Sequence, residues 1–92
     1  MPYHLIVPRE VSQAIGRFGL SRVALINLLT TLRQELESHG DAYRQNRDPS
    51  LSDVRFLFEL TLWDGGRVRA FRFVVDDAQA PGYLFAVAAE EI

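Results

Sequence analysis

The side chains best suited to chemistry in this 92-residue chain lie between residues 55 and 72. Arg69 and Arg72 could hold a phosphate group, because the guanidinium fork matches the geometry of phosphate oxygens. Glu59 could move a proton, and Trp63 could stack on a base or anchor a partner. Ordinary roles are equally open: Trp63 could cover the edge of a sheet, and Glu59 and Arg72 would form a simple ion pair on neighbouring strands.

The positive charge of the chain is carried by arginine alone: all ten basic residues are arginines, and all precede residue 73. Residues 1–75 hold ten arginines and eight acids, a balance of +2, whereas residues 76–92 hold four acids and no base, a balance of −4. The net charge is therefore −2. A nucleic-acid-binding domain usually has a clear basic excess. A nucleic-acid site in this chain would have to be an arginine patch on one face.

Cofactor, metal and membrane signals are missing from the sequence. The chain has no cysteine, and its two histidines, His4 and His39, have no partners at metal-ligand spacing. No phosphate-binding loop, dinucleotide fingerprint or serine nucleophile motif occurs. The first residues lack the features of a signal peptide, and uncharged runs such as residues 23–32 are too short to span a bilayer. We therefore expect no cofactor, no metal, no membrane contact and a cytoplasmic location.

Two helices are predicted in the first half of the chain. They follow a β-rich run at residues 3–7, and the first of them is predicted over residues 10–18. The stronger helix is predicted over residues 22–39, where leucines recur at helical spacing at positions 25, 28, 29, 32 and 36. Ser21 is suited to cap its N-terminus, and Gly40 to follow its C-terminus.

A β-hairpin is predicted in the second half. Residues 54–63 alternate between two faces, Asp64-Gly65-Gly66 is typical of a two-residue turn, and residues 67–75 form the return strand. This parity places Arg72 on the face opposite the phenylalanines, because a one-residue slip would bury its charge among them. The same face would hold Arg55, Glu59 and Trp63. A last strand is predicted over residues 83–89.

These elements predict a single α+β domain over residues 1–92. An N-terminal strand and a helical pair would pack on one face of an antiparallel β-meander of about four strands. A hydrophobic content of 48% is enough to form a core at this length.

The order of strand, two helices and three antiparallel strands resembles the RelE/ParE superfamily of toxins. The closest local match is the HigB-like, phage-derived branch, whose members carry a segment similar to "LWELR…GGRVYRVFYF…IVLLHGFVKK". Here the corresponding stretches are Leu57-Phe58-Glu59-Leu60, then residues 65–73, which read GGRVRAFRF, and residues 83–91, which read YLFAVAAEE. The resemblance covers about the last 35 residues by motif and the whole chain by layout.

The resemblance implies a toxin that cleaves mRNA on the ribosome and is neutralised by a cognate antitoxin. Such cleavage uses the 2′-hydroxyl of the RNA as nucleophile, so the protein must hold the backbone in line, neutralise developing charge and move protons. Arg67, Arg69 and Arg72 match basic positions of the family hairpin, and Glu59 matches its glutamate. Arg72 and Glu59 are thus the catalytic candidates, and the candidates for binding nucleic acid are Arg55, Arg67, Arg69 and Trp63.

The C-terminal segment departs from the family pattern. Where the family tends to have histidine, glycine and phenylalanine followed by two lysines, this chain has Val87-Ala88-Ala89 and then Glu90-Glu91. Lysine is absent altogether. The alternative hypothesis is therefore a non-catalytic module of the same fold that binds a protein partner or dimerises. An unpaired sheet edge would favour a homodimer.

Overall fold

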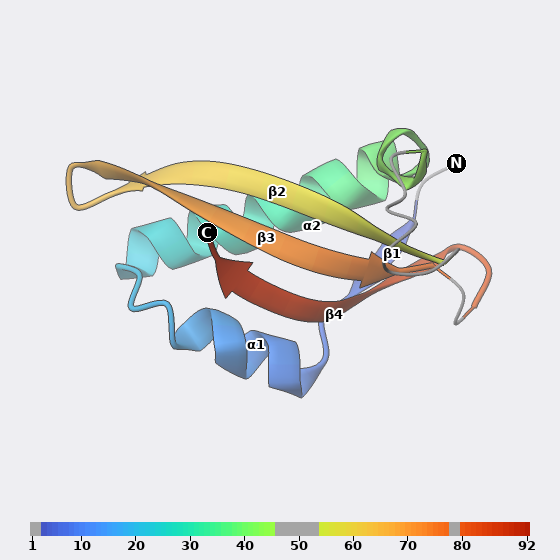
Figure 1. Cartoon of the computed structure of the whole chain (residues 1–92), viewed down its shortest axis with the longest axis horizontal. Coiled ribbons are helices and arrows are strands. Elements are labelled where there is room, and N and C mark those ends of the chain that lie inside the picture. The colour runs from blue at the N-terminus through green and yellow to red at the C-terminus, as the bar shows by residue number, and fades with distance from the viewer. Residues whose placement is uncertain (1–2, 46–53, 78–79) are drawn as a thin grey trace.

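The computed structural model describes residues 3–45, 54–77 and 80–92 of the chain. Two helices and four strands follow one another in the order strand, helix, helix and three strands (Figure 1). Their bounds are β1 His4–Ile6, α1 Arg9–Gly16, α2 Arg22–Arg44, β2 Arg55–Asp64, β3 Arg67–Asp76 and β4 Tyr83–Glu91. The predicted α+β class is confirmed.

The four strands form one mixed sheet in the order β1-β4-β3-β2. The predicted antiparallel meander is confirmed for β2, β3 and β4, whereas β1 joins β4 in parallel. The two helices intervene between β1 and the meander, and a parallel strand needs a crossover connection of this kind. The local pattern of residues 3–7 predicted a strand but carried no signal for its direction.

Both helices contribute to one hydrophobic core against the same face of the sheet. Leu28, Leu32 and Leu36 of α2 are fully buried, as the leucine spacing predicted, while Leu25 is partly buried and Leu29 is exposed. The other members of the core cluster are Val11 and Ile15 of α1 and, from the sheet, Leu5, Phe56, Phe58, Phe71, Phe73, Val75, Leu84 and Ala86. The opposite face of the sheet carries no described helix and is called the open face below.

The Gly65-Gly66 turn sets the register of the hairpin. Both glycines have positive φ, 61° and 81°, the conformation that a two-residue type I′ loop requires. The strands then pair from Asp64 opposite Arg67 to Arg55 opposite Asp76 without interruption. The predicted parity is confirmed, because the hairpin phenylalanines point to the core while Arg72 lies on the open face.

A β-bulge interrupts the pairing of β4 with β3. Ala86 lies opposite Val75, but the next residue of β3, Val74, lies opposite Ala88, so Val87 is the extra residue. The bulge changes the parity of the end of β4. Glu90 consequently pairs with Arg72 on the open face, and Glu91 points to the helix-covered face.

The prediction that Gly40 follows the end of the second helix is wrong. The helix does not end at residue 39 but continues to Arg44, with one non-helical residue, His39, at a kink. Gly40 is buried inside the helix, and a Cβ atom there would lie 2.6 Å from Cδ2 of Tyr3. The glycine therefore permits close packing of Tyr3 and does not cap the helix. The first helix also differs, since it spans residues 9–16 and not 10–18.

Replacing Gly40 by alanine should destabilise the fold, because the added methyl group overlaps the Tyr3 ring. We expect Gly40→Ala to lower the free energy of unfolding by about 1–3 kcal/mol, as overpacking does elsewhere. The matched control is Gly16→Ala, where a Cβ atom meets nothing within 4 Å. That variant should be neutral or stabilising by up to about 1 kcal/mol, since alanine favours the helix. Urea unfolding of the two variants measures both effects, and equal stability would contradict the packing role of Gly40.

Candidate functional site

The open face carries most of the residues predicted to do chemistry. Arg55, Glu59 and Trp63 of β2 lie on it, and Arg72 of β3 lies between β2 and β4. Arg67 is exposed at the hairpin end, where it pairs with Asp64. The structure thus brings Glu59 and Arg72 together, while Arg67 lies at the start of β3, five residues before Arg72.

Arg72 is held between two glutamates that the sheet register places on either side of it. Its Nε lies 3.3 Å from Oε1 of Glu59, and its Nη1 lies 3.3 Å from Oε1 of Glu90. The exposed fractions of the side chains are 36% for Arg72, 53% for Glu59 and 64% for Glu90. These exposed pairs contribute little to stability. Their main consequence is electrostatic, since the cluster has one positive charge and two negative charges.

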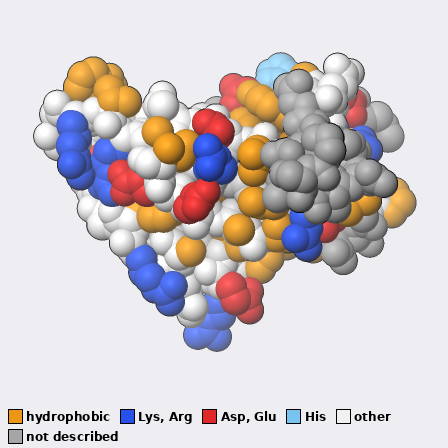
Figure 2. All heavy atoms as spheres, viewed as in Figure 1, with side chains coloured by type: hydrophobic (Ala, Val, Ile, Leu, Met, Phe, Trp, Pro, Cys, Tyr) orange, Lys and Arg blue, Asp and Glu red, His pale blue; other side chains and the backbone are white. Residues whose placement is uncertain are grey.

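Arg55 is also paired with an acid on the open face. Its Nε lies 3.3 Å from Oδ2 of Asp76, whose side chain is buried. Among the described strand residues of the open face, two arginines therefore stand beside three carboxylates, a balance of −1. In the view of Figure 2, basic side chains are scattered over the surface and several lie directly beside acidic ones.

Arg69 lies on the opposite side of the sheet from Arg72. Only 9% of Arg69 is exposed, and its guanidinium lies 5.6 Å from the centre of the Phe71 ring. It makes two hydrogen bonds with Glu91, at 2.8 and 2.6 Å, and a third of 3.4 Å with Asp64. The carbonyl oxygen of Phe18 accepts a fourth, of 2.5 Å. Four of the five donors of this guanidinium are thus engaged inside the fold.

The Arg69 cluster shifts the pKa values of its acids. The hydrogen bonds from Arg69 lower the pKa of Glu91. Hydrogen bonds from Ser21 lower the pKa of Asp64, and the charge of Arg69 adds to that effect. In return, Glu91 raises the pKa of Arg69. The cluster ties the segment between the helices, the hairpin and the end of β4 to one buried cation.

A second polar cluster, not identified from the sequence, joins the N-terminal segment to the end of α2. Arg44 donates to Asp77 at 2.5 Å and also to the hydroxyl oxygen of Tyr3. The Tyr3 hydroxyl in turn donates to Asp41 at 2.5 Å, which raises the pKa of Tyr3 and lowers that of Asp41. Its members come from segments far apart in the chain, so no spacing rule could have found it.

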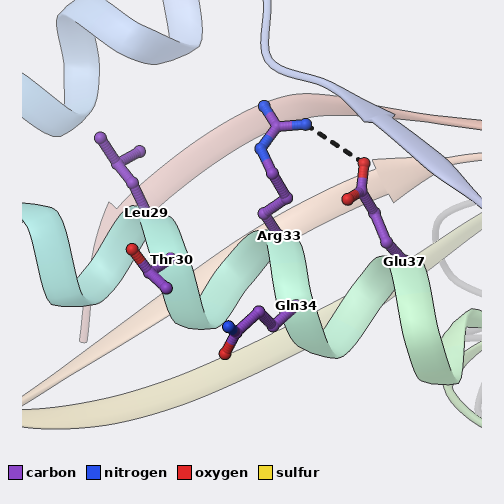
Figure 3. Close-up of a pocket in the computed structure, with 5 residues that line it drawn as sticks. All are labelled: Leu29, Thr30, Arg33, Gln34 and Glu37. Carbon is purple, nitrogen blue, oxygen red and sulfur yellow. Dashed lines mark hydrogen bonds and ion pairs between the residues drawn. The ribbon is translucent and has the colours of Figure 1, made fainter.

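A shallow groove of about 330 Å³ runs along α2 and is lined by Leu29, Thr30, Arg33, Gln34 and Glu37 (Figure 3). Its two charged side chains are 3.2 Å apart. Both also bind the backbone of β1: Arg33 donates to the Leu5 carbonyl, and Glu37 accepts from the Leu5 amide. The groove therefore holds no pair of charged groups free to act on a ligand.

No family model, curated protein or solved structure matches the chain. None of the helices in the described ranges is long and apolar enough to cross a membrane. Within the same ranges, no three histidine, aspartate or glutamate side chains are grouped so as to hold a metal ion. The chain is thus an α+β domain whose open sheet face carries paired charges and an exposed tryptophan.

The two neighbouring glutamates of β4 should differ in their effect on stability. At pH 7, Glu91→Gln should lower the free energy of unfolding more than Glu90→Gln, because Glu91 binds the buried Arg69. The Glu91 pKa is depressed in the folded chain, so its contribution is present above the unfolded value near 4.5 and is lost as the pH falls through the folded pKa.

Urea midpoints of wild type and both variants between pH 7 and pH 3 test this difference. The gap between wild type and Glu91→Gln should narrow below about pH 4. An unchanging gap, or equal effects of the two substitutions at pH 7, would contradict the role assigned to the Arg69 cluster.

Proposed function

We propose that this chain is a non-catalytic protein-binding module and not an mRNA-cleaving toxin. The observation that carries the proposal is the placement of Arg72, the central arginine of the open face, between the carboxylates of Glu59 and Glu90. An arginine in this position is already neutralised. A phosphate group approaching it would meet two negative charges for each positive one.

RNA cleavage would require the opposite electrostatics. The transition state gains negative charge, which a catalytic site must stabilise with donors and cations already in place. Binding of the RNA backbone likewise depends on cations that replace counterions. The described open face has a balance of −1, and Arg69 is engaged with Glu91 on the other side of the sheet. Both features weigh against a phosphate grip on this face.

Protein binding is supported by the apolar side chains that the open face exposes. Trp63 is 70% exposed and lies opposite Val68, which is also exposed. Tryptophan is among the residues that contribute most to protein interfaces, because it buries a large rigid surface. An exposed tryptophan with an apolar neighbour, rimmed by paired charges, fits a protein surface better than a nucleic acid.

The toxin remains the second candidate, and one contact favours it. Glu59 and Arg72, the two residues that the family resemblance made catalytic candidates, lie 3.3 Å apart on an exposed face. An RNA strand lying on this face could reach both. The two functions make different predictions in cells.

Induced expression in bacteria separates the two candidates. We expect the wild type to leave growth and mRNA intact, because Arg72 is neutralised. The Arg72→Ala variant should behave in the same way, and so should Arg9→Ala, a control at an exposed arginine far along the chain. The measurements are growth curves and mapping of mRNA ends. Growth arrest with cleavage that Arg72→Ala abolishes and Arg9→Ala retains would overturn the proposal in favour of the toxin.

The electrostatic premise can be tested with RNA alone. The double variant Glu59→Gln/Glu90→Gln changes the charge of the cluster from −1 to +1. We expect it to bind a single-stranded RNA oligonucleotide more tightly than the wild type, with a steeper loss of affinity as salt rises. Adding Arg72→Ala to the double variant should remove the gain. A wild type that binds RNA as tightly as the double variant would show that the two glutamates do not block the arginine.

A further inference from the structure

The two edges of the sheet differ in whether their outward main-chain groups are already hydrogen-bonded. At the β1 edge, the backbone groups that point away from β4 are taken by α2. The Leu5 amide donates to Glu37 at 2.8 Å, Arg33 donates to the Leu5 carbonyl at 3.0 Å, and the Tyr3 amide donates to the Glu37 carbonyl at 2.9 Å. Figure 3 shows Arg33 and Glu37 turned toward each other on one side of α2. Leu5, the central residue of β1, therefore has no main-chain group left for a further strand.

At the β2 edge, the main-chain groups that point away from β3 have no such partners among the described residues. β2 is the last strand of the sheet order and has ten residues. In a two-residue hairpin the residues flanking the loop are a hydrogen-bonded pair, and bonded pairs then alternate along the strands. Even-numbered residues of β2 therefore bond to β3, and the Val54 carbonyl, which accepts from the Asp77 amide, fits this parity.

The odd-numbered residues of β2 direct their amides and carbonyls away from the sheet. They are Arg55, Leu57, Glu59, Thr61 and Trp63. No residue in the described ranges makes a main-chain hydrogen bond to these five. The strand also contains neither proline nor lysine, the residues that commonly protect an edge. Among the described residues this long edge is unpaired, and an unpaired edge is a template for another strand.

We propose that a second copy of this chain pairs with β2, antiparallel, about a two-fold axis at Leu60. This inference rests on the proposed function and names its partner. In this register Leu57 lies opposite the partner's Trp63, and Glu59 lies opposite the partner's Thr61. Four pairs of outward residues would exchange about eight main-chain hydrogen bonds. The two open faces then form one continuous surface.

The charges and apolar groups of β2 select this register among the symmetric ones. An axis at Glu59 would set two glutamates directly opposite each other, which is destabilising. With an axis at Phe58, Trp63 would have no β2 residue of the partner opposite it. With an axis at Thr61, Leu57 would have none. Only the axis at Leu60 avoids opposed like charges and also covers the exposed Trp63 with an apolar side chain. One strand thus supplies both halves of a closed two-fold interface.

Single cysteines test the register, because the natural chain has none. Leu60→Cys would place two thiols in a non-hydrogen-bonded pair at a Cα separation of about 4.5 Å, within the range for a disulfide. The control Leu62→Cys lies on the same face, but its two thiols would be four residues out of register, roughly 13 Å apart along the strand.

Mild oxidation followed by non-reducing electrophoresis should give a covalent dimer for Leu60→Cys and none for Leu62→Cys. A wild type that sediments as a monomer at all accessible concentrations would overturn the proposal. So would a dimer that is cross-linked by Glu59→Cys and not by Leu60→Cys.

Opposite charges at Thr61 give a second test that a general loss of stability would not mimic. Thr61→Glu faces the partner's Glu59 and should raise the dimer dissociation constant, whereas Thr61→Lys should lower it. With two such pairs in each dimer, the expected change is roughly 2- to 30-fold in each direction. Sedimentation and the emission of Trp63, the only tryptophan, report dissociation on dilution. Shifts of the same sign for both variants would overturn the pairing.

The same preparations distinguish a failure of this inference from a failure of the proposed function. If the chain is a monomer and leaves mRNA intact, the β2 dimer is rejected and the proposal of a binding module still holds. If the chain forms the β2 dimer and also cleaves mRNA, the interface is supported and the proposal of a non-catalytic function is rejected. The cross-linking result and the RNA result are independent measurements.

Discussion

The register of the β2–β3 hairpin is the constraint on which the other features of this structure depend. The Gly65-Gly66 turn sets it, and from it follows the face on which every side chain of both strands lies. Phe58 and Phe73 form part of the core only in this register. Arg72 and Glu59 meet on the open face for the same reason. A shift of one residue would exchange the core for the charged face, so hydrophobic burial and charge placement stabilise one arrangement together.

The β4 bulge extends this control to the C-terminal strand. Regular alternation from Leu84 would have turned Glu90 toward the helices and Glu91 toward the open face. The extra residue at Val87 reverses both, so Glu91 reaches the buried Arg69 and Glu90 reaches Arg72. Two adjacent glutamates of the same chemistry thus have different consequences. One compensates a cation that burial would otherwise penalise, and the other neutralises a cation that would otherwise be available to a ligand.

Features set by neighbours in the sequence were predictable, and features set by distant segments were not. The alternation of β2 and β3, the glycine turn and the Ser21 cap, whose hydroxyl accepts from the Ala24 amide at 3.2 Å, are local and agree with the predictions. By sequence, Arg69 and Arg72 are both candidates for binding phosphate, whereas the structure places Arg69 on the face of the phenylalanines. Its partners could not be inferred, because Glu91 becomes one only through the bulge. Gly40 was misassigned for a similar reason: a glycine near a helix end is usually a cap, and its role here depends on Tyr3, 37 residues earlier.

The partners of an arginine decide its chemistry more than its presence does. A hairpin rich in arginines, taken by itself, is typical of a phosphate-binding surface. In the folded chain, each arginine of the sheet other than Arg67 faces a carboxylate within 3.4 Å. These carboxylates lie on three different strands, so the neutralisation belongs to the fold and not to any one motif. The described open face thus has no excess of positive charge, although its strands carry several arginines.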